Sequence, residues 1–257
     1  MFKLATTKSI RQELTKNWEY NAPLMNVVER NCHEDVKMIG DSVRIRDKIS
    51  GAYLFSPANW NELKILLEDV GEKLDTFMIN TGIYNKEVLR KFPLAIISEY
   101  DFYVLNKKDK VHGGRAGEDF EITSLDLNWL DFILARYKDK EFGHQSYIFD
   151  RILYGLGLGL LYKGEKAAFV LQHKNGETGA LVVEEKYRRL GLGGELLKHF
   201  NRVLFEKNSI LFALVEKNNI ASANTMINGG YKKVSNNIIW VYHNEERYAI
   251  PTVGQGK

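Results

Sequence analysis

A glycine-rich turn is the part of the sequence best suited to chemistry. Residues 187–197 read Tyr-Arg-Arg-Leu-Gly-Leu-Gly-Gly-Glu-Leu-Leu and follow the apolar run Ala180-Leu181-Val182-Val183. Apolar residues then recur at the spacing of one buried helix face, at Leu196, Leu197, Phe200, Val203 and Leu204. The glycines therefore lie at a predicted helix N-terminus, where unpaired N–H groups and the helix dipole favour an anion. We expect this turn to accommodate a pyrophosphate.

The spacing of the glycines separates three nucleotide-binding motifs. A Walker loop would need Lys-Ser/Thr after its last glycine, and the dinucleotide fingerprint would need a glycine where Leu196 stands. Arg-x-x-Gly-x-Gly fits, through Arg188, Gly191 and Gly193. The alternative is a tight strand-to-helix turn with incidental arginines. Between a strand and a Leu-Leu helix, the pattern resembles motif A of the GNAT superfamily of acyl-CoA-dependent N-acyltransferases.

The predicted elements around this turn follow the GNAT order over about Phe120 to Asn244, which implies a mixed α/β (α+β) sheet. Helical patterns occupy Leu130–Tyr137 and Ser146–Tyr154, followed by strands at 155–162, 167–172 and one ending at Val183. Asn175-Gly176 predicts the hairpin between the last two of these strands. After the glycine helix come a strand at 210–215, a helix at 219–228 and strands at 231–234 and 238–242.

The first hundred residues also alternate helix and strand. Helices are expected at 9–18, near 24–28, at 60–70 and at 85–91, with strands at 42–46, 52–55, 76–79, 94–97 and 102–105. This part has no glycine loop and no acid–base cluster, so it is a candidate scaffold and a candidate degenerate second copy of the fold. We predict an N-terminal half at residues 1–105, a linker at 106–119, an acyl-CoA-binding GNAT domain at 120–245 and a flexible tail at 246–257.

A narrower resemblance is to the glycine N-acyltransferase-like branch. It rests on Gly176-Glu177, with Glu177 ten residues before Tyr187, and on the opening sequence Ile122-Thr123-Ser124-Leu125-Asp126. That branch also carries an N-terminal half without motif A. The resemblance implies acetyl-CoA or another acyl-CoA as co-substrate, no metal, and a tandem arrangement.

The resemblance also implies a set of cofactor-binding residues. The pantetheine arm would pair with the strand backbone at Leu181, Val182 and Val183, and a backbone N–H there would meet the thioester oxygen. Asn219 matches the asparagine that opens the helix of motif B. The pyrophosphate would bind the run Arg188, Arg189, Leu190, Gly191, Leu192, Gly193, Gly194 and Glu195.

Glu177 is the candidate catalytic base, because the branch pattern places its catalytic glutamate at this offset. The alternative is a solvated hairpin glutamate. His173 competes for the role with an ordinary pKa of about 6.5, or is an exposed histidine at a strand end. Met226 stands where many GNAT enzymes have a tyrosine as general acid. The missing acid does not exclude an enzyme, because the leaving coenzyme A thiolate, whose thiol has a pKa near 8.5 if cysteine is the guide, can leave without full protonation.

The function expected from these residues is transfer of an acyl group from acyl-CoA to a primary amine, such as an amino acid like glycine, by direct attack in a ternary complex. A catalytically silent acyl-CoA-binding or sensing protein is the alternative.

Composition bounds the partners and the compartment. Lys and Arg exceed Asp and Glu by 36 to 33, a net charge of +3, which does not indicate a nucleic-acid surface. Cys32 is the only cysteine, which favours a reducing compartment, and no apolar run reaches the roughly 20 residues that span a bilayer. We expect a cytoplasmic enzyme with a small-molecule acceptor and without a membrane partner. Residues 1–12 are rich in basic and hydroxyl residues, as mitochondrial presequences are, so the mitochondrial matrix is the alternative compartment. The other interpretation of these residues is an ordinary first helix.

Overall fold

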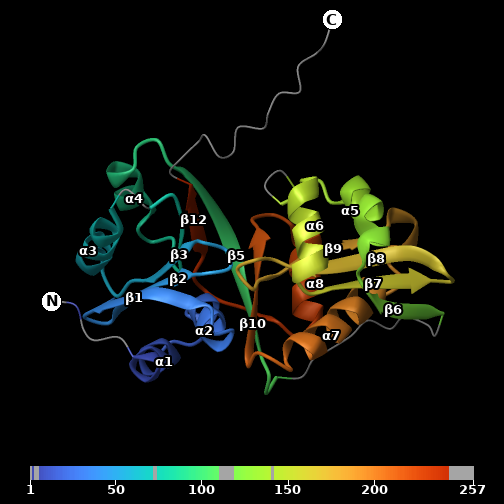
Figure 1. The fold of residues 1–257 in the computed structure, drawn as a ribbon, viewed down its shortest axis with the longest axis horizontal. Helices are drawn as coiled ribbons and strands as arrows, with labels where there is room; N and C mark the ends of the chain where they lie inside the picture. The colour runs from blue at the N-terminus through green and yellow to red at the C-terminus, as the bar shows by residue number, and fades with distance from the viewer. Residues whose placement is uncertain (1, 3–5, 72–73, 110–118, 140–141, 243–257) are drawn as a thin grey trace, which may run out of the picture.

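The computed structural model describes residue 2 and residues 6–71, 74–109, 119–139 and 142–242. The predicted tail and residues 110–118 of the predicted linker lie outside this part. Figure 1 shows the N-terminal half at left, the C-terminal half at right, and strands β12, β5 and β10 between them. None of the helices in the described ranges is long and apolar enough to cross a membrane.

The two halves share one order of elements: two helices, strands, a helix, a strand, a helix and a final strand. To this order the C-terminal half adds one strand before its two helices and a two-residue strand before its final strand. The N-terminal half contains α1 (Thr7–Thr15), α2 (Ala22–Glu29), β1 (His33–Ile39), β2 (Ser42–Asp47), β3 (Tyr53–Ser56), α3 (Trp60–Val70), β4 (Thr76–Ile79), α4 (Asn85–Lys91) and β5 (Ile96–Asn106). The C-terminal half contains β6 (Phe120–Ser124), α5 (Leu130–Arg136), α6 (Gln145–Tyr154), β7 (Gly157–Tyr162), β8 (Glu165–Gln172), β9 (Thr178–Val183), α7 (Leu192–Leu204), β10 (Ile210–Glu216), α8 (Ile220–Asn228), β11 (Lys232–Lys233) and β12 (Ile238–Tyr242).

The two halves exchange strands. The larger sheet has the order β1-β2-β3-β4-β12-β5-β10, with β11 beside β5, and the smaller sheet has the order β6-β7-β8-β9. Strand β5 of the N-terminal half pairs with β10, where Val104 faces Phe212, while β12 of the C-terminal half pairs with β4, where Phe77 faces Val241. Sheet pairing therefore crosses the predicted boundary at residues 106–119.

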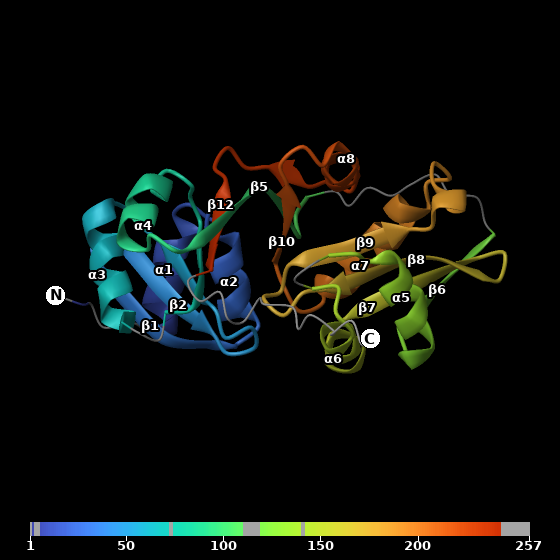
Figure 2. The same ribbon diagram turned by 90° about the horizontal axis from the view of Figure 1, so that it is seen from above.

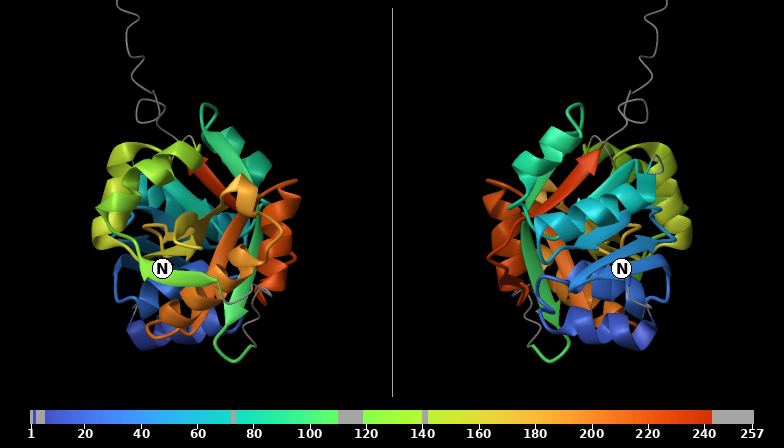
Figure 3. Two further views of the ribbon diagram at one scale, coloured as in Figure 1. Left: turned by 90° about the vertical axis from the view of Figure 1, so that its right-hand side faces the viewer. Right: turned by 90° about the vertical axis from the view of Figure 1, so that its left-hand side faces the viewer.

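Helices cover both faces of each sheet (Figures 2 and 3). On β8, Ala168 and Val170 pack toward α7, whereas Phe169 and Leu171 pack toward α5 and α6, as the two-residue period of a strand requires. In the larger sheet, α1 and α2 cover one face and α3 covers the other. Each fully buried Leu or Phe in these layers contributes about 1.5–3 kcal/mol relative to exposure.

Three strands differ from the sequence-based expectation. The strands predicted at 94–97 and 102–105 are one continuous strand, β5, and β1 and β6 were not predicted as strands. The polar stretch Ser98–Asp101 in the middle of β5 lies half-buried between two partner strands, so its pattern is not that of a strand with one buried face.

Strand exchange predicts that neither half is stable alone. A fragment of residues 120–242 would expose the edges of β10 and β12 that β5 covers, and a fragment of residues 1–105 would lack β12. We expect each fragment to aggregate or to lack a cooperative unfolding transition, and the co-expressed pair to form one complex. Circular dichroism and size-exclusion chromatography measure both properties. A monomeric 120–242 fragment with a cooperative thermal transition would contradict the exchange.

Candidate functional site

The two halves differ at one equivalent position. In the N-terminal half α3 joins β3 to β4, and these two strands are paired in parallel, with Leu54 facing Met78. In the C-terminal half α7 joins β9 to β10, but β9 is the edge of the smaller sheet and β10 is the edge of the larger one. Helix α7 packs in one core with residues of both sheets, including Leu160 of β7 and Leu211 of β10. The strands that flank α7 are thus unpaired in the C-terminal half, whereas the equivalent strands of the N-terminal half are paired, and the space between β9 and β10 is named the gap.

A β-bulge shapes the strand beside this gap. Val182 pairs with Phe169 and Gly179 pairs with Leu171, so two residues of β9 stand opposite one residue of β8. Within this bulge Ala180 has a φ of 50°, which is uncommon for a residue with a side chain. A bulge bends the strand and increases its twist. It therefore helps β9 diverge from β10, and the sequence offered no clear signal for it.

The glycine turn forms the predicted N-terminus of α7. Gly191, with a φ of 80°, is the N-cap, and its carbonyl oxygen accepts from the N–H groups of Gly194 (3.1 Å) and Glu195 (3.2 Å). Within the described residues, no hydrogen bond occupies the backbone N–H groups of Leu192 and Gly193. A Cβ on Gly193 would lie 3.1 Å from Val183 Cγ2, so this end of the helix approaches β9 closely. The turn and the strand predicted to hold one ligand are therefore neighbours.

The side chains of the predicted phosphate-binding run lie in different surroundings. Arg188, Arg189 and Leu190 are exposed, and Arg188 Nε donates to the carbonyl oxygen of Val183 at 3.3 Å. Leu192 is buried in the core. Glu195 is buried and forms an ion pair with Lys198 at 3.3 Å, so its carboxylate is not a phosphate ligand. Only the backbone and the two arginines of this run suit an anion.

The other predicted cofactor residues flank the gap. Leu181, Val182 and Val183 are half-buried on β9, whose outer edge borders the gap. Asn219 is exposed and caps α8, because its Oδ1 accepts from the N–H of Ser222 at 3.1 Å. The part of Asn219 that can donate to a ligand is therefore its side-chain NH₂ group.

Glu177, the candidate base, is buried directly before β9. Its Oε1 accepts from the N–H of Leu214 on β10 at 3.0 Å, and its Oε2 accepts from Asn175 Nδ2 at 3.3 Å. The backbone N–H of Glu177 donates to Asn175 Oδ1 at 3.1 Å. The solvated hairpin glutamate that the sequence allowed is thereby excluded. The carboxylate joins the two strands at one end of the gap.

His173 is not the ordinary titrating histidine that the sequence allowed. Burial lowers its pKa to about 4, with a smaller contribution from Arg151 and an opposing one from Asp139. The Nδ1 atom lies 2.8 Å from the hydroxyl of Tyr147. The ring is therefore neutral at physiological pH, and it is a weaker base than an exposed imidazole.

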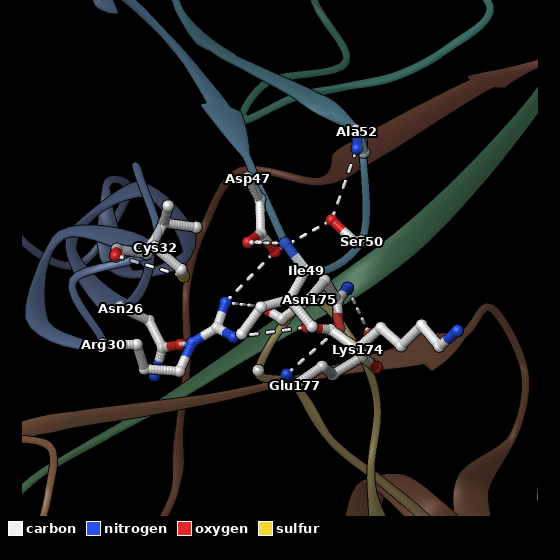
Figure 4. Close-up of polar contacts among 12 residues, drawn as sticks. Asn26, Arg30, Cys32, Asp47, Ile49, Ser50, Ala52, Lys174, Asn175 and Glu177 are labelled. Atoms are coloured by element: carbon white, nitrogen blue, oxygen red, sulfur yellow. Dashed lines mark hydrogen bonds and ion pairs between the residues drawn. The ribbon is translucent and has the colours of Figure 1, made fainter. Parts of the chain in front are cut away.

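Arg30, at the end of α2, fixes the turn that carries Glu177 (Figure 4). It donates to the carbonyl oxygens of Lys174 (3.2 Å) and Asn175 (3.0 Å), and it pairs with the fully buried Asp47 at 3.2 Å. These contacts join the N-terminal half to the candidate base. Sequence reasoning missed Arg30 and Asp47, because no local pattern connects residues almost 150 positions apart.

The predicted hairpin at Asn175-Gly176 is present, and the close approach of the other half constrains it. Gly176 has a φ of 87°, which favours glycine. A Cβ at this position would also lie 2.1 Å from Asn26 Oδ1, which accepts from Arg30 Nε. The glycine therefore serves the contact between the halves as well as the turn.

The position where many GNAT enzymes have a tyrosine is occupied by Met226. Met226 is the buried residue of α8 and packs in one core with residues of α7. Burial raises the pKa of Tyr231, whose hydroxyl lies 3.1 Å from Thr178 Oγ1 and 2.8 Å from Asn201 Oδ1. Those contacts tie β9 to α7.

Among the residues that the structure describes, no group of three or more His, Cys, Asp or Glu could hold a metal ion.

The pKa of His173 predicts a pH dependence of stability. Its folded pKa of about 4 lies below the unfolded value of about 6.5, so the unfolded chain binds more protons between these values and stability is lost as pH falls. From about pH 7.5 to about pH 5, wild type should lose about 2 kcal/mol more unfolding free energy than His173→Gln. Urea unfolding measures this difference. Equal pH slopes for the two proteins would contradict a buried neutral histidine.

Comparison with known proteins identifies the architecture. The family model described as FR47-like protein matches residues 154–241. A solved Drosophila protein aligns over 95% of this chain and 98% of its own, with 18% identity and a TM-score of 0.66. A GCN5-related N-acetyltransferase from Kribbella flavida covers 88% of this chain and 95% of its own, with 11% identity and a TM-score of 0.57.

A conserved protein of unknown function from Staphylococcus epidermidis aligns over 78% of this chain and 91% of its own, with 12% identity and a TM-score of 0.51. The search of curated proteins gave no match. The FR47-like match covers β7 to β11 and most of β12, including the glycine turn. The chain therefore has the mixed α/β GNAT fold that its sequence predicted.

Proposed function

We propose that the protein transfers an acyl group from acyl-CoA to a primary amine. The observation that carries this proposal is the unpaired edge of β9, which borders a gap beside the glycine turn. The equivalent strands of the N-terminal half, β3 and β4, are paired with each other. Within the described ranges, a free strand edge beside a glycine-rich helix N-terminus is found in the C-terminal half alone.

Acyl-CoA binding would use both features. The amide groups of the pantetheine arm would pair with the backbone of β9 at Leu181–Val183, as an added strand does. The free N–H groups of Leu192 and Gly193 would receive the pyrophosphate, and the exposed Arg188 and Arg189 would add charge-assisted contacts.

The reaction would proceed by direct attack. The neutral amine attacks the thioester carbonyl carbon, the C–N bond forms, and the C–S bond breaks to release the coenzyme A thiolate. Glu177 would take the proton that the amine loses, and a backbone N–H at the bulge of β9 would stabilise the oxyanion. A leaving thiolate with a pKa of about 8.5 tolerates the absence of an acid at Met226.

A silent acyl-CoA-binding protein is the second candidate. Both carboxylate oxygens of Glu177 already accept a hydrogen bond, and Met226 supplies no proton. These observations favour a protein that binds the thioester without turning it over. A small amino acid such as glycine is the acceptor that the resemblance to the glycine N-acyltransferase-like branch favours under the first candidate.

The variant Glu177→Gln tests the enzyme directly. Glutamine retains a carbonyl oxygen for the N–H of Leu214 but removes the base, so turnover should fall by about 10²–10⁴-fold while coenzyme A affinity changes little. Higher pH should partly restore the rate, because the amine then arrives deprotonated. The assay measures free thiol released from acetyl-CoA and longer acyl-CoAs with a panel of amines, and calorimetry measures coenzyme A binding.

Glu206→Gln is the matched control, since Glu206 is an exposed glutamate two residues past the end of α7. Wild-type turnover by Glu177→Gln across neutral and alkaline pH would remove Glu177 as the base. Tight coenzyme A binding by a wild-type protein that acylates no amine would favour the silent binder.

A further inference from the structure

A cavity of 280 Å³ lies between the two halves and has no role in the binding of acyl-CoA proposed above. Arg46 and Tyr53, from β2 and β3, line it from the N-terminal half. Phe142, His173 and Asn175 line it from the C-terminal half. Because the lining comes from both halves, the cavity exists only in the assembled chain.

Aromatic side chains form much of the cavity lining. The Phe142 ring lies 4.6 Å from His173 and 5.1 Å from Tyr147, measured between ring centroids. Tyr53 and Trp240 line the cavity as well. Faces of this kind suit a flat or bulky apolar group.

Two cations stand beside these rings. The Arg46 guanidinium lies 5.8 Å from the Tyr53 ring centroid, and Lys174 Nζ lies 5.8 Å from that of Tyr147. Each forms an ion pair with a carboxylate outside the lining, yet their side chains remain 42% and 36% exposed. Asp75 is the one carboxylate among the lining residues in the described part of the chain. The lining therefore favours a ligand that carries an anionic group.

Glu177, the candidate base, does not line the cavity but forms hydrogen bonds with two residues that do. Asn175, a lining residue, donates to Glu177 Oε2 at 3.3 Å and accepts from the N–H of Glu177 at 3.1 Å. The N–H of His173, a second lining residue, donates to the carbonyl oxygen of Glu177 at 3.0 Å. Figure 4 shows Asn175 and Glu177 together on the turn that Arg30 holds.

We propose that this cavity binds the acceptor, and that the acceptor is a primary amine carrying both a carboxylate and an aromatic or large apolar group. The inference rests on the acyl transfer proposed above. The carboxylate would meet Arg46 and Lys174, the apolar group would contact the rings of Phe142 and Trp240, and the amine would lie toward Glu177. The N-terminal half thus selects the acceptor.

Size argues against glycine as the preferred acceptor. An apolar cavity of about 150 Å³ is enough to hold a benzene ring, and this cavity measures 280 Å³. Glycine would leave the aromatic walls without a contact, whereas free phenylalanine would fill more of the space. Phenethylamine has the same ring and amine but no carboxylate, so it isolates the contribution of the cations.

The test compares glycine, free phenylalanine and phenethylamine as acceptors of the acetyl group of acetyl-CoA. We expect phenylalanine to have the lowest KM, at least about tenfold below phenethylamine, because a charge-assisted contact is lost in the latter. Arg46→Gln should remove this preference, whereas Arg90→Gln, a matched exposed arginine on α4, should retain it. Equal KM values for phenylalanine and phenethylamine, or a preference for glycine, would overturn the assignment.

A direct binding measurement separates this inference from the proposed function. Saturation-transfer NMR of wild type with phenylalanine, in the presence of coenzyme A, needs no turnover. If no amine is acylated but phenylalanine binds, and Arg46→Gln weakens the binding of phenylalanine, the cavity assignment stands and the acyl-transfer proposal fails. If amines are acylated but no saturation transfer to phenylalanine is seen, the cavity assignment fails and the acyl-transfer proposal stands.

Discussion

The unpaired edge of β9 is the constraint on which the site depends. Exposed strand edges invite pairing, and the equivalent strands β3 and β4 pair with each other in the N-terminal half. Two features keep β9 and β10 apart in the C-terminal half: the bulge at Ala180 twists β9, and α7 packs across both sheets. Glu177 joins the two strands at one end only, by accepting from the N–H of Leu214. The gap is thus built into the packing.

The N-terminal half supports this gap although it has no glycine turn of its own. It supplies β5, which pairs along β10, and it receives β12 in return. Arg30 and Asp47, both largely shielded from water, hold the turn that carries Glu177. Removing one partner of a buried ion pair generally destabilises a protein by about 3–5 kcal/mol. A half that resembles a degenerate copy therefore positions the candidate base.

The sequence predicted the features that local patterns encode. The apolar period of α7 and the glycines before it placed the helix N-terminus, and Asn175-Gly176 placed the hairpin. Strand β1 was missed, because His33–Ile39 is rich in polar residues and forms a bulged edge strand. Strand exchange, the contact of Arg30 with the hairpin and the burial of His173 depend on distant segments meeting. No window of sequence contains those partners, so these features required the fold.

Hydrogen–deuterium exchange with and without acetyl-CoA tests the central claim most directly, because it reads the backbone N–H groups that the gap leaves free. If acyl-CoA occupies the gap, the amides of Thr178–Val183 and of the turn from Arg188 to Gly193 should exchange more slowly with the ligand present. The amides of β3 and β4 should be unchanged, since their edges are already paired. Protection confined to β3, β4 or the connection into α3, with none in β9, would contradict the account.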